Sequence, residues 1–229
     1  MHSKLDVVML GDSITAHAAY LYPDAWADAF EGLDALPLGV YGDSIHKLVW
    51  RLLFGGEKLA LAPRVVIVLI GVNDLQNGRT AEQAAERLDW LLTWLSATWP
   101  SSDVILQALL PTTKVDVGPA NEAWAALAAE HGVTFSTCGS DLDPSDPRQY
   151  VDSVHPSEAG YRRFLPCLAE EARELLAEDR CGLSGAPAPA PAPAPAPGPA
   201  LAAVDGGLGR PEVAELSAAP EAAGRQSDV

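Results

Sequence analysis

The sequence predicts an α/β fold in which helices cover both faces of a parallel β-sheet. Two features lead to this prediction. Short, continuous apolar runs recur along residues 1–180, and segments with helical spacing lie between them. A strand that is apolar throughout is buried on both faces, which is typical of parallel sheets whose strands are connected by helices.

Five apolar runs are predicted to be the strands of this sheet. Each is short and bounded by turn-forming or polar residues, as strands are. They are VVML (7–10), ALPLGV (35–40), RVVIVLI (64–70), DVILQALL (103–110) and GVTFST (132–137).

Four segments are predicted to be the main helices, at residues 44–54, 80–99, 121–132 and 157–178. In the second of these, leucines recur at helical spacing and share one face, which identifies the side that packs on the sheet. They are Leu88, Leu91, Leu92 and Leu95. Thr80, with Gln83 three residues later, has the pattern of a capping box at the start of this helix.

The composition indicates one folded domain and a tail. With 229 residues, 48% of them hydrophobic, the chain can bury a full core. Alternating proline and alanine over residues 185–200 removes backbone donors and prevents helix or sheet. The residues after this stretch have too little apolar bulk to pack. We therefore predict a domain over residues 1–180 and a disordered, low-complexity tail over residues 181–229.

Charge and targeting signals narrow the class of partner. The formal charge of −16 disfavours nucleic acid or an anionic membrane surface, since both require clustered lysine and arginine. No apolar run approaches the roughly 18 residues of a membrane span. The first residues lack the apolar stretch of a signal peptide, so a cytoplasmic location is predicted. Cys138, Cys167 and Cys181 form no C-x-x-C motif, and free or buried thiols are favoured over disulfides.

The tripeptide Gly-Asp-Ser occurs twice, at residues 11–13 and at residues 42–44. Both copies follow predicted strands, and in open parallel sheets the reactive groups lie beyond the carboxyl ends of the strands. Ser13 precedes a helix-like segment, where its hydroxyl is exposed beside backbone N–H groups. Because turns also collect Gly, Asp and Ser, a turn or a helix cap explains either copy equally well.

Three other positions could complete a catalytic site. Asn73 follows the third predicted strand, and its amide is either a turn former or an oxyanion donor. Gly42 offers a backbone N–H with no side chain beside it. Asp152 precedes His155 by three residues, and Pro156 prevents helix on that side. An aspartate at this offset can fix the tautomer of the imidazole, so a catalytic histidine is favoured over a surface one.

Taken together, the motifs resemble the four blocks of the SGNH (GDSL) hydrolase superfamily, and the match covers nearly the whole predicted domain. The blocks are Gly11-Asp12-Ser13, Gly42, Gly71-x-Asn73-Asp74 and Asp152-x-x-His155-Pro156. The resemblance implies a three-layer αβα sandwich with a five-stranded parallel sheet, as in flavodoxin-like folds. The chain lacks the G-x-S-x-G elbow of ordinary α/β-hydrolases, which speaks against that fold.

The resemblance also implies roles for individual residues. Ser13 is the implied nucleophile, with His155 as its base and Asp152 orienting the base. The N–H groups of Ser13 and Gly42 and the amide of Asn73 form the implied oxyanion hole. Asp12 and Asp74 of the same blocks are expected to support the site. No metal and no cofactor are expected.

A narrower resemblance, to the catalytic subunits of intracellular platelet-activating-factor acetylhydrolase, lies in FEGLDALPLGVYGDSIHKLVWRLLFGGE, APRVVIVLIGVND and LLPTT. It implies a serine esterase of lipid metabolism that removes a small, acetyl-type acyl group from a small-molecule ester through an acyl-enzyme, and it implies a homodimer. Tyr41 stands where those subunits usually carry a small residue. A carbohydrate acetylesterase or a thioesterase of the same superfamily is an alternative, and a non-catalytic scaffolding protein with this fold is the alternative of another class.

Ser44 differs from Ser13 in the segment that it precedes. It opens an amphipathic stretch whose apolar face comprises Ile45, Leu48, Val49 and Leu52. We therefore interpret Ser44 as the N-cap of a helix and Ser13 as the nucleophile. His46 is close in sequence, but residues two apart on a helix do not face each other, so no Ser44–His46 pair is expected.

Overall fold

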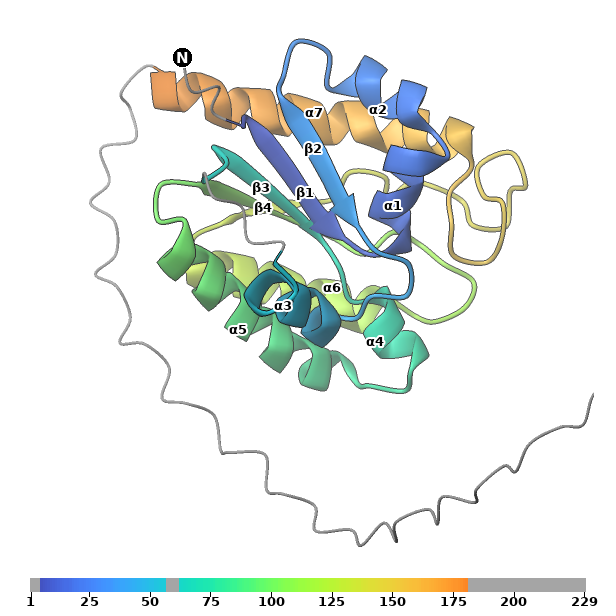
Figure 1. The fold of residues 1–229 in the computed structure, drawn as a ribbon. Coiled ribbons are helices and arrows are strands. Elements are labelled where there is room, and N and C mark those ends of the chain that lie inside the picture. The colour runs from blue at the N-terminus through green and yellow to red at the C-terminus, as the bar shows by residue number, and fades with distance from the viewer. Residues whose placement is uncertain (1–4, 57–61, 181–229) are drawn as a thin grey trace, which may run out of the picture. The chain divides into compact units, whose positions relative to one another are not determined.

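The computed structural model describes residues 5–56 and 62–180 (Figure 1). The elements in chain order are β1 (Val7–Gly11), α1 (Ser13–Tyr20), α2 (Pro23–Ala29), β2 (Ala35–Gly39), α3 (Ile45–Leu53), β3 (Val65–Leu69), α4 (Val72–Gln76), α5 (Ala81–Thr98), β4 (Asp103–Gln107), α6 (Gly118–His131), β5 (Thr134–Ser136) and α7 (Glu158–Arg180). The predicted tail, residues 181–229, lies outside the described residues, and the domain boundary at residue 180 stays a prediction.

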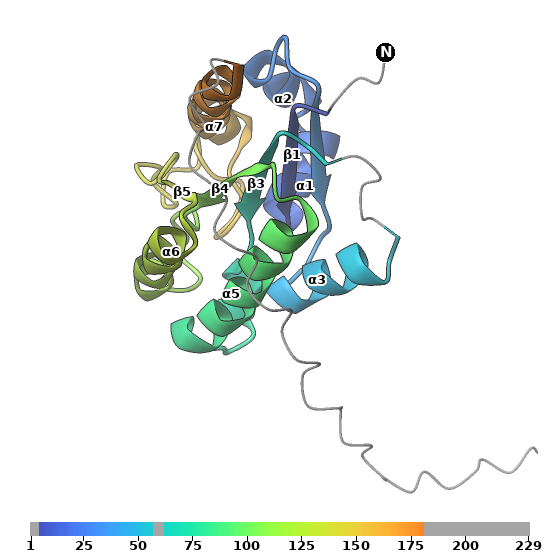
Figure 2. The same ribbon diagram turned by 90° about the vertical axis from the view of Figure 1, so that its left-hand side faces the viewer.

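The strands form one parallel sheet of five, in the order β2-β1-β3-β4-β5. Helices α1, α2 and α7 cover one face, and α3, α4, α5 and α6 cover the other, so the domain has three layers (Figures 1 and 2). The predicted αβα fold is confirmed. Every residue of β1 and β3 is buried, because these inner strands have a strand on each side and helices on both faces.

The structure refines several predicted boundaries. The capping box of α5 is present, with the N–H of Gln83 bonded to the Thr80 hydroxyl and the N–H of Thr80 bonded to the Gln83 amide. β4 ends at Gln107, earlier than predicted, because its neighbour β5 ends at Ser136. Just beyond β4, the Asn121 side chain takes the place of a neighbouring strand and forms hydrogen bonds with the N–H and C=O of Leu109. The short helices α2 and α4 were not predicted.

Helix α1 packs unusually close to the sheet, and two glycines make this possible. A Cβ at Gly39 of β2 would lie 2.2 Å from the backbone N of Ala16 and 2.5 Å from the carbonyl O of Asp12. A Cβ at Gly11 would lie 2.1 Å from the Thr15 hydroxyl. Since no side chain fits in either place, α1 begins directly at the carboxyl edge of the sheet, and Ser13 is its first residue.

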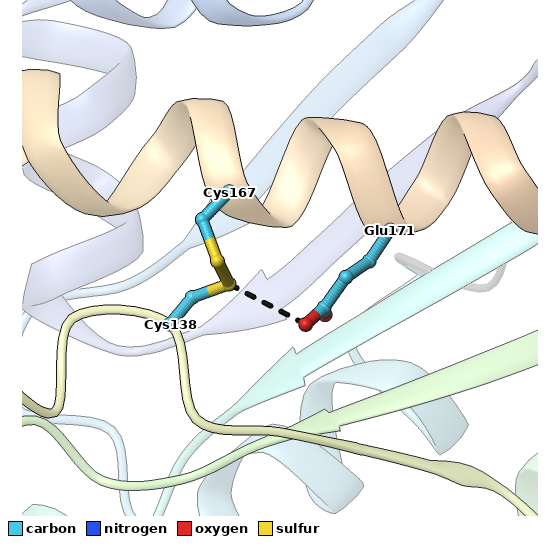
Figure 3. A group of neighbouring side chains, drawn as sticks. All are labelled: Cys138, Cys167 and Glu171. Carbon is cyan, nitrogen blue, oxygen red and sulfur yellow. Dashed lines mark hydrogen bonds between the residues drawn. A yellow bond between two sulfur atoms is a disulfide. The ribbon is translucent and has the colours of Figure 1, made fainter.

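The cysteines depart from the prediction. Cys138, in the loop after β5, and Cys167, on α7, form a disulfide with their Cα atoms 5.7 Å apart (Figure 3). The expectation of free thiols is therefore wrong for this pair. The two residues are 29 positions apart, and only the passage of this loop alongside α7 brings them together. Cys181 lies outside the described residues.

We expect Gly39→Ala to destabilise the domain by about 2–3 kcal/mol or more, because backbone atoms surround the new methyl group and cannot move aside independently. Urea denaturation measures the change. Gly118→Ala is the matched control, since the nearest atom to its Cβ is the Asp116 carboxylate at 3.2 Å and a helical alanine is favourable. If Gly39→Ala were as stable as Gly118→Ala, the close approach of α1 to β2 would be wrong.

Candidate active site

The predicted site residues converge at the carboxyl edge of the sheet. Strand β1 lies between β2 and β3, and the chain order reverses there, which is where open α/β sheets bind their ligands. Ser13 follows β1, Gly42 follows β2 and Asn73 follows β3. The loop before α7 adds Asp152 and His155. Each position is thus set by the end of a different element.

Ser13, His155 and Asp152 form a continuous hydrogen-bonded chain. The Ser13 Oγ lies 2.8 Å from His155 Nε2, and His155 Nδ1 lies 2.8 Å from Asp152 Oδ2. Ser13 is buried, whereas about half of the Asp152 side chain is exposed. A serine, a histidine and an aspartate in this order can activate the hydroxyl as a nucleophile.

Asp152 is held in its ionised form by the groups around it. Burial alone would raise its pKa, but hydrogen bonds from the His155 ring and from the backbone N–H groups of His155 and Val154 outweigh this effect and lower the pKa. The carboxylate therefore accepts from Nδ1–H, which leaves Nε2 of a neutral His155 with a lone pair directed at the Ser13 hydroxyl.

The three predicted oxyanion donors are neighbours. The N–H of Ser13, the first residue of α1, has no intrahelical acceptor. Gly42 has a φ of +71° and no atom within 4 Å of its Cβ position, so its backbone is open to a ligand. Asn73 Nδ2 donates to the Asp43 carbonyl at 2.8 Å and lies 3.4 Å from Asp12 Oδ2. The amide is thus fixed between the residues adjacent to Gly42 and Ser13.

Asp12 and Asp74, the predicted supporting residues, are both buried. Asp12 caps α1 by accepting from the N–H of Ile14 at 2.9 Å. Burial, with a smaller contribution from nearby Asp43, raises the pKa of Asp12 to about 7 in spite of that hydrogen bond. Asp74 accepts from the N–H of Ile45 at 2.8 Å and from Arg87 at 3.1 Å, so it anchors the start of α3.

The interpretation of Ser44 is corrected in part. Ser44 occupies the N-cap position of α3, but its side chain makes no capping bond, because Asp74 supplies the acceptor instead. The Ser44 Oγ lies 2.9 Å from His46 Nδ1, so the expectation that these two residues do not meet is wrong. Ser44 lies outside the helix, where the spacing rule for helical neighbours does not apply. Arg87 also lies 3.3 Å from His46 Nδ1, which makes this nitrogen an acceptor in a structural network.

Arg51 is a buried residue next to the site whose role the hydrophobic periodicity of the sequence did not predict. Its guanidinium is buried and bonds to the Asp43 carboxylate at 2.6 Å, the Gly11 carbonyl at 2.9 Å and the Leu38 carbonyl at 3.0 Å. It thereby ties the ends of β1 and β2 to the loop that contains Gly42. The only sequence signal was a basic residue on the apolar face of the predicted helix.

A second residue that sequence reasoning missed is His17, which lies on α1 one turn after Ser13. Its ring packs against that of His155, with the ring centroids 4.6 Å apart. The spacing of four residues from a helical Ser13 was the available signal, because residues at i and i+4 share a helix face.

Within the described residues, the side chains that could hold a metal ion are Cys138, Cys167 and Glu171, whose ligand atoms all lie within 4.8 Å of one another (Figure 3). They do not fit one while the disulfide is intact, since the thiolate is the form of cysteine that binds metals. The Cys138 sulfur lies 3.5 Å from Glu171 Oε1. A disulfide sulfur has no hydrogen to donate, and burial raises the pKa of the Glu171 carboxyl beside it.

Comparison with known proteins identifies the family. The model of the GDSL-like lipase/acylhydrolase family matches residues 9–163, which include Ser13, Gly42, Asn73, Asp152 and His155.

The chain belongs to the GDSL-like lipase/acylhydrolase family.

Relatives and solved structures agree with this assignment. The chain is 30% identical to the platelet-activating factor acetylhydrolase IB subunit alpha1 of Bos taurus over 194 residues, which are 80% of this chain and 81% of the relative. A lipase/acylhydrolase from Enterococcus faecalis shares the fold with a TM-score of 0.58 at 20% identity, over 74% of this chain and 95% of that one. An acetyl xylan esterase gives a TM-score of 0.57 at 18% identity, over 74% and 98%.

This GDSL acylhydrolase is therefore an ester hydrolase, and its substrates are small-molecule esters. In the part of the chain that the structure describes, no helix has the length and apolarity to cross a membrane.

We expect Asp12→Asn to raise the free energy of unfolding by more than about 1 kcal/mol at pH 8, because each unit of pKa shift corresponds to about 1.4 kcal/mol. The pKa of Asp12 is about 7 in the folded protein against an ordinary value of 3.8. Between these values the folded protein keeps a proton that the unfolded chain has lost, so wild-type stability falls as pH rises through this window. The amide stays neutral, and the gain should therefore be small at pH 4.

Urea denaturation at both pH values tests this expectation. Asp24→Asn, at the exposed start of α2, is the control and should show no gain that grows with pH. A gain for Asp12→Asn of the same size at pH 4 and pH 8 would show that ionisation of the buried carboxyl is not the cause.

Proposed function

We propose that the protein is a serine esterase that hydrolyses a carboxylic ester with a small acyl group through an acyl-enzyme intermediate. The observation that supports this proposal is the chain of two 2.8 Å contacts from Asp152 through His155 to the Ser13 hydroxyl. It lies at the carboxyl edge of the sheet, beside the orphan N–H of Ser13 and the Asn73 amide, which the Asp43 carbonyl holds in place.

In the proposed reaction, Ser13 Oγ attacks the carbonyl carbon of the ester while its proton passes to His155 Nε2. The oxyanion of the tetrahedral intermediate accepts hydrogen bonds from the N–H of Ser13, the N–H of Gly42 and the amide of Asn73. The bond to the alcohol oxygen then breaks, and His155 gives its proton to the departing alcohol. Water repeats these steps, releases the acid and restores the Ser13 hydroxyl.

Three observations support a small, acetyl-type acyl group. The bovine relative, which matches most of this chain, carries the name acetylhydrolase. Only 6% of Ser13 is exposed, so neighbouring groups closely surround the residue that would carry the acyl group. The connections that follow β1, β2 and β3 have at most five residues before the next helix, so none of these three could form a long acyl tunnel. Homodimer formation, a cytoplasmic location and independence of nucleic acid stay predictions.

A cavity of about 430 Å³ adjoins the loop that contains Gly42. Its lining comprises Val40, Asp43, His46, Lys47, Trp50 and Arg51. Lys47 also donates to the Gly42 carbonyl at 3.0 Å. Substrate groups in this cavity would therefore contact side chains that hold the loop containing Gly42.

We expect Ser13→Ala to reduce kcat by about 10⁴-fold or more and to abolish labelling by a fluorophosphonate probe, since no other group replaces the nucleophile. Ser44→Ala is the matched control: it also removes a buried hydroxyl that bonds to a histidine. It should cost about 1 kcal/mol of stability and keep most of the activity. Labelling that survived in Ser13→Ala and disappeared in Ser44→Ala would assign the nucleophile to Ser44 instead.

We expect kcat/KM to be highest for acyl chains of about two to four carbons, because a pocket of fixed size discriminates between substrates by each added methylene. A series of p-nitrophenyl esters from acetate to decanoate measures this preference. Faster turnover of decanoate than of acetate would contradict the small acyl group while leaving the esterase reaction intact.

A further inference from the structure

The feature that carries a further inference is the contact between two histidines in the crevice. His17 lies on α1 one helical turn beyond Ser13, and its side chain faces the loop that contains His155. The two imidazole rings lie at an angle of 31° with their centroids 4.6 Å apart. His17 is only 7% exposed, so its ring is held by the side chains that pack around it and has little contact with solvent.

Aromatic neighbours hold the His17 ring on its other sides. Tyr41, next to Gly42, lies 5.3 Å from it, and Tyr22 lies 6.4 Å away in an edge-on arrangement. Tyr22 in turn packs on Tyr161 of α7 at 5.0 Å. Tyr161 is fully buried and donates to the Ile14 carbonyl of α1. The rings of Tyr22, Tyr41 and His155 therefore surround that of His17.

The environment of His17 keeps its ring neutral. Its Nδ1 is buried and has no hydrogen-bond partner among the described residues, so a protonated ring would leave a buried N–H unsatisfied. Burial lowers the pKa of His17, the positive charge of a protonated His155 lowers it further, and Asp152 opposes these effects only in part. His155 therefore has a neutral aromatic face beside it.

Asp152 alone holds His155 weakly. Its carboxylate accepts a hydrogen bond from one ring nitrogen, Nδ1, and 52% of the Asp152 side chain is exposed to solvent. A single hydrogen bond to an exposed carboxylate leaves the imidazole free to tilt about that bond. A rigid ring packed on its face removes this freedom.

We propose that His17 is a positioning residue, whose ring holds His155 in the orientation that keeps Nε2 at the Ser13 hydroxyl. A neutral His17 also places no positive charge beside the imidazolium that forms on His155 when Ser13 loses its proton. The role rests on the proposed function, since it requires His155 to be the base. His17 itself exchanges no proton in this scheme.

Two substitutions distinguish the effect of the flat His17 ring from the effect of its nitrogen atoms. His17→Phe keeps a flat, neutral face of similar size, and His17→Ala removes the face. We expect His17→Ala to reduce kcat by about tenfold or more with little change in KM, because displacement of a catalytic group by a fraction of an ångström is costly. His17→Phe should retain most of the wild-type kcat.

His131→Ala is the matched control. It also removes a part-buried histidine, one that pairs with Asp89 at 2.7 Å between α6 and α5, far along the chain from the site residues. It should lower the melting temperature without changing kcat. Equal losses of kcat in His17→Phe and His17→Ala, or an unchanged kcat in His17→Ala, would overturn the proposal.

A double-mutant cycle provides a readout that a purely structural role would not change. If His17 acts through His155, then His17→Ala should have almost no further effect on the residual rate of a His155→Ala enzyme. A loss of the same size in both backgrounds would show that His17 does not act through His155. Ser13→Ala keeps the two proposals distinct, because full activity in that variant contradicts the esterase mechanism whatever the His17 variants show.

Discussion

The buried guanidinium of Arg51 joins the parts of the structure on which the site depends. It bonds to the last residue of β1, to the end of β2 and to the Asp43 carboxylate, which follows Gly42. Removing one partner of a buried ion pair leaves an uncompensated charge, so neither Asp43 nor Arg51 can be lost alone without a large cost. The Asp43 carbonyl also holds the Asn73 amide. Two of the three proposed oxyanion donors, Gly42 and Asn73, therefore depend on this one cation.

The proposed nucleophile, Ser13, is fixed by a different constraint, the close packing of backbone on backbone. Gly11 and Gly39 let α1 start against the sheet, and the Asp12 carboxyl caps its first turn. Ser13 thus lies at a helix N-terminus, where the peptide dipoles favour the negative charge that develops in the proposed reaction. Arg51 and the glycines act at neighbouring strand ends, whereas the proposed base His155 and its partner Asp152 lie on the loop before α7.

Much of this arrangement follows from the sequence. Continuous apolar runs identified every strand, because inner strands such as β1 and β3 are buried on both faces, and four short motifs identified the residues that meet in the crevice. The remainder depends on contacts between distant segments. Asp74 displaced Ser44 as the cap of α3 from 29 residues away. Arg51 interrupts the apolar face of its helix because its guanidinium binds two carbonyl groups and one carboxylate, and only the folded structure brings these three groups together. Likewise, the Cys138–Cys167 disulfide could not be predicted without knowing which loop runs beside α7.

That disulfide encloses the loop of Asp152 and His155 in a covalent ring. Its two cysteines are 29 positions apart, and both Asp152 and His155 lie between them. A protease that cut this exposed loop once would open the ring without separating the fragments. The segment carrying β5 and the rest of α7 would stay joined through sulfur. Cleavage would then be visible on a gel only after reduction, and the nicked protein could keep its core while losing the register between His155 and Ser13.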